Sequence, residues 1–358
     1  MRHRLHWLAV QPTPYNDYLF RALAADPELD LTVHFREHGL ASHPWKETLG
    51  VGYQSRTYRR RFGLDWQALW LAATDRRSFF VIAGWDHPTA QLAALLRSTG
   101  GRYAIWTDTP RDGPRSLVRG ALRTTWLRFL FRTAHRILGT GAPGVAALEA
   151  LGCPREKLVS FPFFVDLDAF QSVARSERRP ITFASSGRLE LAIKGQDVAV
   201  EALAAASART GFRDYRYRIA GVGPDEASLR ALVNARGLAD RVEFAGWIEA
   251  AALPAFYAAA DVLLHPARVD PFPVAVLEAM AASLPILGSA AAGSVRDRVT
   301  DGVNGFIHAP GDPQALSRHI ELLFRQPSRV TQLGHEARRT AEAWPVSRGV
   351  ELVKSVVG

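Results

Sequence analysis

The second half of the chain carries cationic and glycine residues where short apolar segments give way to helix-like ones. Arg188 and Lys194 follow such a segment in SSGRLELAIKGQD, and Gly223 follows the next one in AGVGPD. Fixed positive groups beside glycine turns and a helix N-terminus suit the phosphates of a nucleoside diphosphate. A single glycine after a strand is ordinary turn chemistry, so the hypothesis depends on these junctions meeting in space.

Two further junctions add an aromatic side chain and two carboxylates. Trp247 follows VEFAG, and Asp270 and Glu278 lie eight positions apart in HPARVDPFPVAVLEAM, where Glu278 is inside the expected helix. A carboxylate can accept hydrogen bonds from the two hydroxyls of a ribose. Taken together, the four junctions predict a nucleotide-diphosphate ligand.

The elements that must position these residues are alternating strands and helices. Continuous apolar runs separated by helix-like stretches are typical of parallel strands buried on both faces and joined by crossover helices. Ligands of such sheets bind outside the carboxyl ends of the strands. After a loop in QPTPYND, the first helix is expected from about Tyr18. The expected strands are 4–10, 31–35, 79–84, 103–107, 136–140, 181–187, 217–221, 242–246, 261–266, 285–289 and 305–309.

A length of 358 residues predicts two domains. The helix period is lost and charge rises in the segment that ends at Pro180, which favours an interdomain linker there. We therefore expect an N-terminal, basic domain over 1–165, a linker over 166–180 and a ligand-binding domain over 181–343. Residues 344–358 are expected to form a C-terminal helix that packs back on the first domain.

The composition excludes several classes of protein. With 47% hydrophobic and 22% charged residues the chain is neither disordered nor membrane-spanning. The apolar stretch before Gln11 is too short for a secretory leader, and Cys153 is the only cysteine, so no internal disulfide forms. These features favour a reduced, cytoplasmic location.

The charge is concentrated in the first half. Residues 1–165 contain 22 basic and 13 acidic residues, whereas the remainder is balanced, so the first half faces an anionic partner. In 111–136, basic residues alternate with aromatic and aliphatic ones, which is typical of a helix that lies peripherally on an anionic membrane. An ordinary crossover helix is the alternative, and no nucleic-acid motif accompanies the charge. The membrane-contact candidates are Arg115, Arg119, Arg123 and Trp126.

The motifs of the second half, taken in order, resemble the retaining nucleotide-sugar glycosyltransferases of family 4 (glycosyl transferases group 1). They are GRLELAIKGQD, AGVGPDEASLRALVNARGLADRVEFAGW, ADVLLHPARVDPFPVAVLEAMAASLPIL and DRVTDGVNGFIHAPGDPQAL, within about 181–325. The resemblance implies an α/β fold of two facing Rossmann-like domains with parallel sheets, the GT-B architecture. It also implies transfer of a hexosyl residue from a UDP- or GDP-sugar to an acceptor hydroxyl with retention of configuration, in bacterial-type polysaccharide, glycolipid or glycoconjugate synthesis.

The resemblance also implies roles for individual residues. Arg188 and Lys194 would hold the donor diphosphate, Asp270 the donor sugar hydroxyls, and Glu278 the ribose. The remaining donor-side positions are Gly223, Trp247, Phe272 and Val274.

In the first domain the resemblance is weaker. Asn16 in PTPYND and Asp108 at the end of YAIWT occupy acceptor-side positions, Asp108 as a catalytic candidate in place of a family histidine. Asp270 stands where the family usually has Glu, and Pro273 where it usually has Gly, which removes one backbone N–H. The acceptor is expected to be a saccharide, either free or linked to a lipid.

Two alternatives stay open: a catalytically weak or inactive nucleotide-sugar-binding protein of this fold, and a dinucleotide-dependent oxidoreductase. The second is disfavoured because no G-x-G-x-x-G follows the first strand. No metal or cofactor is expected. Asp166 and Asp168 lie in the linker, and the histidines at 34, 87 and 135 lack the spacing of metal ligands.

If residues 111–136 bind a membrane surface, the protein will sediment with vesicles of anionic lipid at low salt. Each arginine near the lipid contributes on the order of 1 kcal/mol, and screening reduces this contribution. Co-sedimentation in 20 mM and 500 mM NaCl measures it, with neutral phosphatidylcholine vesicles as the control. Equal recovery in the supernatant with both lipids would remove the membrane hypothesis.

Overall fold

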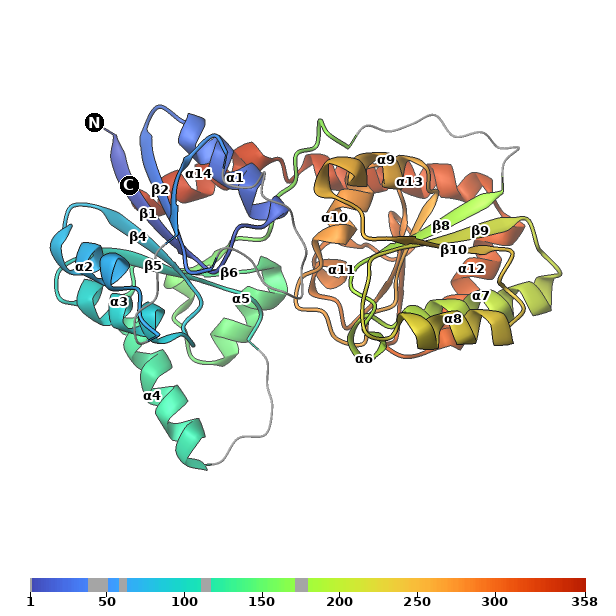
Figure 1. Ribbon diagram of the computed structural model, residues 1–358, viewed down its shortest axis with the longest axis horizontal. Helices are drawn as coiled ribbons and strands as arrows, with labels where there is room; N and C mark the ends of the chain where they lie inside the picture. The colour runs from blue at the N-terminus through green and yellow to red at the C-terminus, as the bar shows by residue number, and fades with distance from the viewer. Residues whose placement is uncertain (1, 38–50, 58–62, 111–116, 171–179) are drawn as a thin grey trace. The chain divides into compact units, whose positions relative to one another are not determined.

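The computed structural model describes residues 2–37, 51–57, 63–110, 117–170 and 180–358, and the chain divides into two units (Figure 1). Unit 1 consists of Met1–Phe164 together with Val346–Gly358, and unit 2 of Val165–Pro345. Each unit is built on one sheet, and within the described residues its paired strands are parallel.

The sheet of unit 1 has the order β3-β2-β1-β4-β5-β6-β7. The polar strand β3 at one edge and the three-residue β7 at the other have no counterpart among the expected strands, because neither has the apolar run of a buried strand. The strands are β1 (His3–Ala9), β2 (Leu29–Phe35), β3 (Gln54–Thr57), β4 (Phe79–Ala83), β5 (Arg102–Thr107), β6 (Arg136–Gly139) and β7 (Leu158–Ser160).

Helices cover both faces of this sheet, with α1 and α14 on one side and α2 and α3 on the other (Figure 1). Helix α4 extends away from the sheet at its N-terminal end (Figure 1). The helices are α1 (Pro14–Ala25), α2 (Trp66–Thr74), α3 (Pro88–Ser98), α4 (Leu117–Thr133), α5 (Gly141–Ala150), the 3₁₀ helix η1 (Arg155–Lys157) and α14 (Val346–Val357).

The first helix begins earlier than the sequence pattern indicated. Thr13 is its N-cap, with a side chain that accepts a hydrogen bond from the Asn16 amide, and Pro14 occupies the first turn. Both are ordinary helix-start residues, so the expected start near Tyr18 was wrong by one turn. Asn16 therefore lies in a helix rather than in a loop.

The end of the chain returns to the first unit. Helix α14 packs against α1, and Lys354 forms an ion pair with Glu28 at 2.7 Å. A Cβ on Gly349 would come within 2.8 Å of side-chain atoms of Leu19 and Phe164, which shows how closely α14 packs. The structure therefore makes unit 1 from two separate pieces of chain.

The sheet of unit 2 has the order β10-β9-β8-β11-β12-β13. Its strands follow six of the expected apolar runs: β8 (Ile181–Ser186), β9 (Tyr215–Ala220), β10 (Val242–Gly246), β11 (Val262–His265), β12 (Ile286–Ser289) and β13 (Gly305–His308). Five of the six residues of β8 are buried, as expected for a strand covered on both faces.

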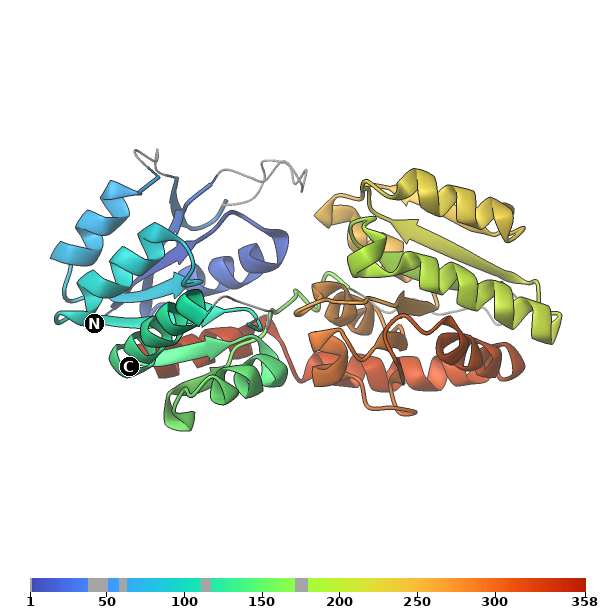
Figure 2. The ribbon, with the colours of Figure 1, turned by 90° about the horizontal axis from the view of Figure 1, so that it is seen from below.

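Helices also cover both faces of this second sheet (Figure 2). One apolar cluster joins the sheet to α7, α8 and α12, and another joins it to α9, α10 and α11. The helices are α6 (Leu191–Lys194), α7 (Gln196–Thr210), α8 (Glu226–Ala235), η2 (Ala250–Ala252), α9 (Leu253–Ala258), α10 (Val274–Ala281), α11 (Gly293–Arg298), α12 (Pro313–Arg325) and α13 (Ser328–Glu342).

Each sheet reverses its strand order once. In unit 1 the reversal lies between β1 and β4, and in unit 2 between β8 and β11. The loops that leave such a pair of strands diverge to opposite faces, which opens a crevice at the carboxyl edge where ligands bind.

A buried arginine joins three backbone segments at the amino end of β4 and β5. Arg97 is fully buried, and its guanidinium donates to the carbonyl oxygens of Asp75 (2.5 Å), Ser78 (2.5 Å) and Arg102 (3.1 Å). It therefore ties α3 to the segments that precede β4 and β5.

We predict that Arg97→Met destabilises the protein by about 3 kcal/mol, because three carbonyl groups lose a charged donor in a buried site. Urea unfolding monitored by circular dichroism measures the change. Arg77→Met is the matched control, since Arg77 is exposed on the adjacent turn. An equal stability of the two variants would contradict the role given to Arg97.

Candidate functional site

The loops that follow β8 and β9 are in backbone contact at the carboxyl edge of the second sheet. A Cβ on Gly221 would lie 1.9 Å from the Gly187 carbonyl oxygen, and one on Gly223 would lie 2.2 Å from that of Leu189. Only glycine allows this approach. The contact places Gly223 beside the turn that carries Arg188.

The short helix α6 is fixed at its start. The Asp225 carboxylate accepts from the Leu191 amide at 2.7 Å, which satisfies one of the free N–H groups of this helix. Arg268 donates to the Leu191 carbonyl at 2.7 Å and binds both oxygens of Asp197 at 2.7 Å. The last residue of α6, Lys194, is therefore held in a defined position after β8.

Lys194 contacts Asp270 directly across the reversal point of the sheet. Its Nζ lies 2.6 Å from Asp270 Oδ2, and the Nε2 of the buried His265 lies 3.3 Å from the same oxygen. Burial by itself would raise the pKa of Asp270, but His265 and Lys194 together lower that pKa to about 2. Asp270 is therefore an ionised carboxylate at neutral pH, although it is almost fully buried.

Glu278 lies in α10 and has the opposite electrostatic character. Burial raises its pKa to about 7, while a hydrogen bond from the Tyr257 hydroxyl at 3.0 Å acts in the other direction. Tyr257 is fully buried, and its hydroxyl also interacts with Ser186 at the end of β8. Glu278 is thereby connected to the same sheet edge as Arg188.

The remaining donor-side candidates lie on the loops around this edge. Trp247 follows β10, where the Gly246 carbonyl accepts from the Gly221 amide at 2.7 Å. Its indole Nε1 is buried without a hydrogen-bond partner among the described residues. Phe272 is buried, and Val274 is the first residue of α10, directly after Pro273.

The structure thus places the predicted donor-side residues of unit 2 on the carboxyl-edge loops and in α10. Lys194 and Asp270 are in direct contact, whereas Arg188 has its ion pair with Glu190 at 3.6 Å. Sequence reasoning missed His265 and Tyr257. His265 ends the apolar strand β11, and Tyr257 lies in the short helix α9. Their link to the carboxylates comes from the folded structure, and no sequence spacing indicates it.

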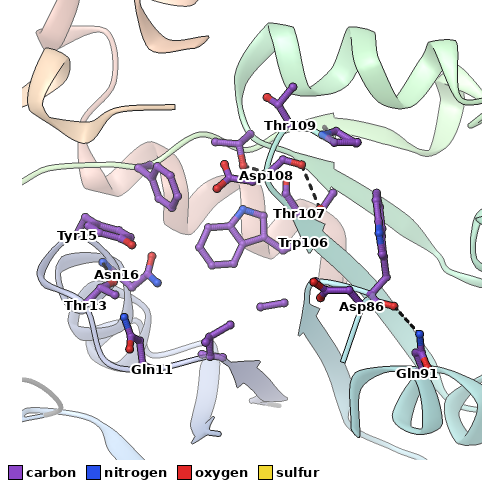
Figure 3. Close-up of a pocket in the computed structure, with 18 of the residues that line it drawn as sticks. Gln11, Thr13, Tyr15, Asn16, Asp86, Gln91, Trp106, Thr107, Asp108 and Thr109 are labelled. Carbon is purple, nitrogen blue, oxygen red and sulfur yellow. Dashed lines mark hydrogen bonds between the residues drawn. The ribbon is translucent and has the colours of Figure 1, made fainter. Parts of the chain in front are cut away.

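Unit 1 contains a cavity of about 1020 Å³ at the carboxyl ends of β1, β4 and β5 (Figure 3). Both acceptor-side candidates line it: Asn16 from α1 and Asp108 from the loop after β5. Burial raises the pKa of Tyr15 to about 12, with Asp108 contributing in the same direction.

Two of the membrane-contact candidates line the same cavity. Arg123 and Trp126 form part of its wall, and the Trp126 indole donates to the Trp85 carbonyl at 3.3 Å. Trp126 therefore has a partner inside unit 1. Arg115 lies outside the described residues, and Arg119 lies in α4 at a position whose side chain is not described.

Within the described residues, no group of three or more His, Cys, Asp or Glu side chains is arranged to hold a metal ion. Asp166 accepts from the Asp168 amide at 3.1 Å in a local turn, and His87 caps α3. His34 contacts His6 at 2.9 Å.

Comparison with known proteins identifies the family. The family model for glycosyl transferases group 1 matches residues 168–340. The chain is 31% identical over 298 residues to WcaL of Escherichia coli strain K12, a glycosyltransferase assigned to colanic acid biosynthesis, covering 78% of this chain and 72% of that protein. The chain belongs to the group 1 glycosyltransferases.

Other relatives match over shorter segments. A GDP-mannose-dependent alpha-mannosyltransferase of Mycolicibacterium smegmatis is 32% identical over 228 residues, 62% of this chain and 56% of that protein. The match to the Salmonella typhimurium WcaL spans 48% of that protein, so the chain covers about half the length of some of its curated relatives.

Solved structures of this glycosyltransferase fold support the architecture. The Anabaena protein HepE, determined in complex with UDP, has a TM-score of 0.77 at 17% identity, with 100% of this chain and 99% of that chain covered. A glycosyltransferase from Rickettsia africae has a TM-score of 0.78 at 12% identity, with 100% of this chain and 98% of that chain covered. The predicted fold class, α/β with two Rossmann-like GT-B domains and parallel sheets, is confirmed.

The pKa of Glu278 leads to a prediction about stability. An acid whose pKa is higher in the folded chain binds its proton more tightly when the chain is folded. The contribution of protonated Glu278 to the free energy of unfolding is therefore present below the unfolded pKa of 4.5 and is lost as the pH rises through about 7. Between pH 5 and pH 8, in the absence of nucleotide, we expect the free energy of unfolding of Glu278→Gln to rise by about 2 kcal/mol relative to that of wild type.

Urea unfolding at the two pH values measures this difference. Glu342→Gln is the matched control, because Glu342 is exposed on α13 of the same unit. If the free energy of unfolding changes equally with pH in the Glu278 variant and in wild type, the carboxyl group of Glu278 is already ionised at pH 5.

Proposed function

We propose that the protein transfers a glycosyl residue from a nucleoside diphosphate sugar to an acceptor hydroxyl. The contact between Lys194 and Asp270 across the reversal point of the second sheet carries this proposal. It puts a cation for the diphosphate and an ionised carboxylate for the sugar hydroxyls at the edge where parallel sheets bind ligands. The UDP complexes of the similarly folded Anabaena protein support a nucleotide ligand of this class.

The chemistry follows from where charge develops. As the bond between the sugar and the diphosphate breaks, negative charge grows on the leaving phosphate, and fixed cations stabilise it most in the transition state. Lys194 and Arg188 supply these cations. Lys194 is 26% exposed, so its charge is screened less by solvent than that of a fully exposed lysine.

The sugar and the ribose are held by two carboxyl groups whose pKa values are shifted in opposite directions. Ionised Asp270 accepts hydrogen bonds from sugar hydroxyls and remains in place through Lys194 and His265. Glu278 accepts from the ribose diol, while Tyr257 fixes its orientation. Trp247 and the backbone around Gly223 lie on the loops that approach the base and the phosphates.

Retention of the donor's anomeric configuration and hexosyl transfer are further parts of the proposal. They rest on the family's usual mechanism, in which the acceptor attacks the same face that the diphosphate leaves. A donor phosphate oxygen then takes the acceptor proton, so the chain needs to supply no nucleophile. The mechanism requires no metal ion and no bound cofactor.

The acceptor is proposed to bind in the cavity of unit 1, next to Asn16 and Asp108. A saccharide acceptor, free or lipid-linked, fits the polysaccharide pathway to which the WcaL relatives are assigned. Among the described residues, no helix is both long and apolar enough to cross a membrane. Action in the cytoplasm, including its membrane surface, is also part of the proposal.

One observation favours a second candidate function, namely nucleotide-sugar binding with little or no transfer. Pro273 precedes α10 where the family usually has glycine, so this position offers no backbone N–H to the sugar. Its carbonyl is already bonded to the Ser294 hydroxyl at 2.8 Å. Binding of a donor without turnover, across a broad panel of acceptors, would identify this function.

We predict that Lys194→Ala loses most donor binding while the fold remains intact. A screen of nucleoside diphosphates and their sugars by thermal shift first identifies the donor, since ligand at 100 times its Kd stabilises by about 2.7 kcal/mol. In Lys194→Ala the shift should disappear, and transfer should fall by about 100-fold or more because one transition-state cation is missing.

Arg318→Ala is the control, a loss of one exposed cation from α12 of the same unit. Glu278→Ala should likewise lose most transfer, through the ribose rather than the phosphates. Wild-type rates in either site variant would remove that residue from the site.

A further inference from the structure

The cavity of unit 1 has a charge opposite to that of the chain around it. Residues 1–165 carry an excess of nine positive charges, which by itself predicts an anionic partner. Yet the charged side chains that line the cavity within the described residues are two carboxylates, Asp86 and Asp108, and one guanidinium, Arg123. Among the described residues of this half, Arg123 is therefore the one basic side chain in the lining.

Both carboxylates are exposed and come from neighbouring loops. Asp86 follows β4 and Asp108 follows β5, and these two strands are paired in the sheet. Figure 3 shows both side chains among the residues around the cavity. An ionised carboxylate only accepts hydrogen bonds, so this edge of the sheet is suited to hydroxyl or ammonium groups that donate them. The negative charge of the carboxylates repels phosphate.

The helices that begin at this edge offer few amides to an anion. Helix α1 starts at Pro14, which has no N–H, and the amides of Asn16 and Asp17 already bond to Thr13. Helix α3 likewise starts with a proline, at Pro88. Helix α5 begins after Thr140, whose side chain makes no capping hydrogen bond.

Five aromatic side chains also line the cavity. Tyr15 and Phe163 meet edge to face with ring centroids 4.7 Å apart, and Trp106 meets Phe163 at 5.7 Å. Trp85 and Trp126 complete this wall. Aromatic faces bind the C–H face of a sugar ring, while a few polar groups fix its orientation.

Two lining side chains have polar atoms without a partner. Gln11 and Trp106 are each 7% exposed, and neither Gln11 Oε1 nor Trp106 Nε1 has a hydrogen-bond partner among the described residues. Leaving such groups buried and unpaired costs free energy, so they indicate a ligand that supplies a donor and an acceptor. A sugar hydroxyl is both.

We propose that this cavity selects a non-anionic saccharide as acceptor, with hydroxyl or protonated amino groups on Asp86 and Asp108 and a ring face on the aromatic wall. The inference rests on the proposed function in taking the occupant as the acceptor. It goes beyond that function in assigning the charge of the acceptor. The two aspartates disfavour a phosphate or carboxylate on the sugar that enters the cavity.

Binding to an array of immobilised oligosaccharides tests this assignment with the full chain. The array carries the same sugar sequences in neutral, amino-bearing, phosphorylated and uronic acid forms. Wild type should bind neutral or amino-bearing glycans at least tenfold more strongly than their anionic counterparts. Preference for anionic forms, or no glycan binding at all, would overturn the proposal.

The double variant Asp86→Asn and Asp108→Asn separates charge from shape. It should lose at least tenfold in binding to amino-bearing glycans and gain binding to the anionic forms, because the repulsion is gone while the side-chain size is kept. Asp30→Asn is the control, an exposed aspartate on β2 outside the cavity. If the double variant keeps the glycan preference of wild type, the two carboxylates do not select between anionic and non-anionic glycans.

The donor site is measured separately on the same wild-type preparation by the thermal shift with UDP and GDP. A nucleotide shift together with anionic glycan preference would overturn only the inference about the acceptor. Neutral glycan binding without any nucleotide shift would instead overturn the proposed transfer reaction.

Discussion

The contact between Lys194 and Asp270 is the interaction on which the donor-side geometry depends. It spans the point where the second sheet reverses its strand order, and it joins a helix that follows β8 to a loop that follows β11. Because Asp270 is buried, its charge is sustained only by partners, and the two that sustain it are Lys194 and His265. Among the described residues no cation lowers the pKa of Glu278, and burial raises that pKa to about 7. The surroundings of the two acids of one motif thus shift their pKa values in opposite directions.

Most of the fold was predictable from sequence, because buried parallel strands appear as apolar runs. The runs at 181–187 and 242–246 became β8 and β10 with nearly the expected bounds. Strand β3 was not predictable, since QSRT has no apolar period and pairs only at the sheet edge. The start of α1 was missed because its prolines suggested a loop, although a proline in the first turn is compatible with a helix.

The candidate site was predictable to the extent that its residues lie at strand ends. Arg188, Lys194 and Asp270 follow β8 or β11, so parallel topology alone brings them to one edge. His265 and Tyr257 could not be found in this way, because they reach the carboxylates through side-chain packing. In unit 1 the net charge of the sequence indicated an anionic partner, whereas the cavity has more carboxylates than cations among its described lining. Charge summed over a chain segment does not give the charge of a particular surface.

The return of α14 to unit 1 affects the order in which the chain can fold during synthesis. Unit 2 is one continuous stretch, Val165–Pro345, whereas unit 1 needs Val346–Gly358 against α1. The ribosome therefore releases all of unit 2 before the last helix of unit 1 emerges. Until then the apolar surface of α1 that receives α14, around Leu19, has no cover from that helix. Unit 1 is thus completed only after unit 2 has been synthesised. Until then its earlier segments are partly assembled, and their exposed apolar surface is available to chaperones.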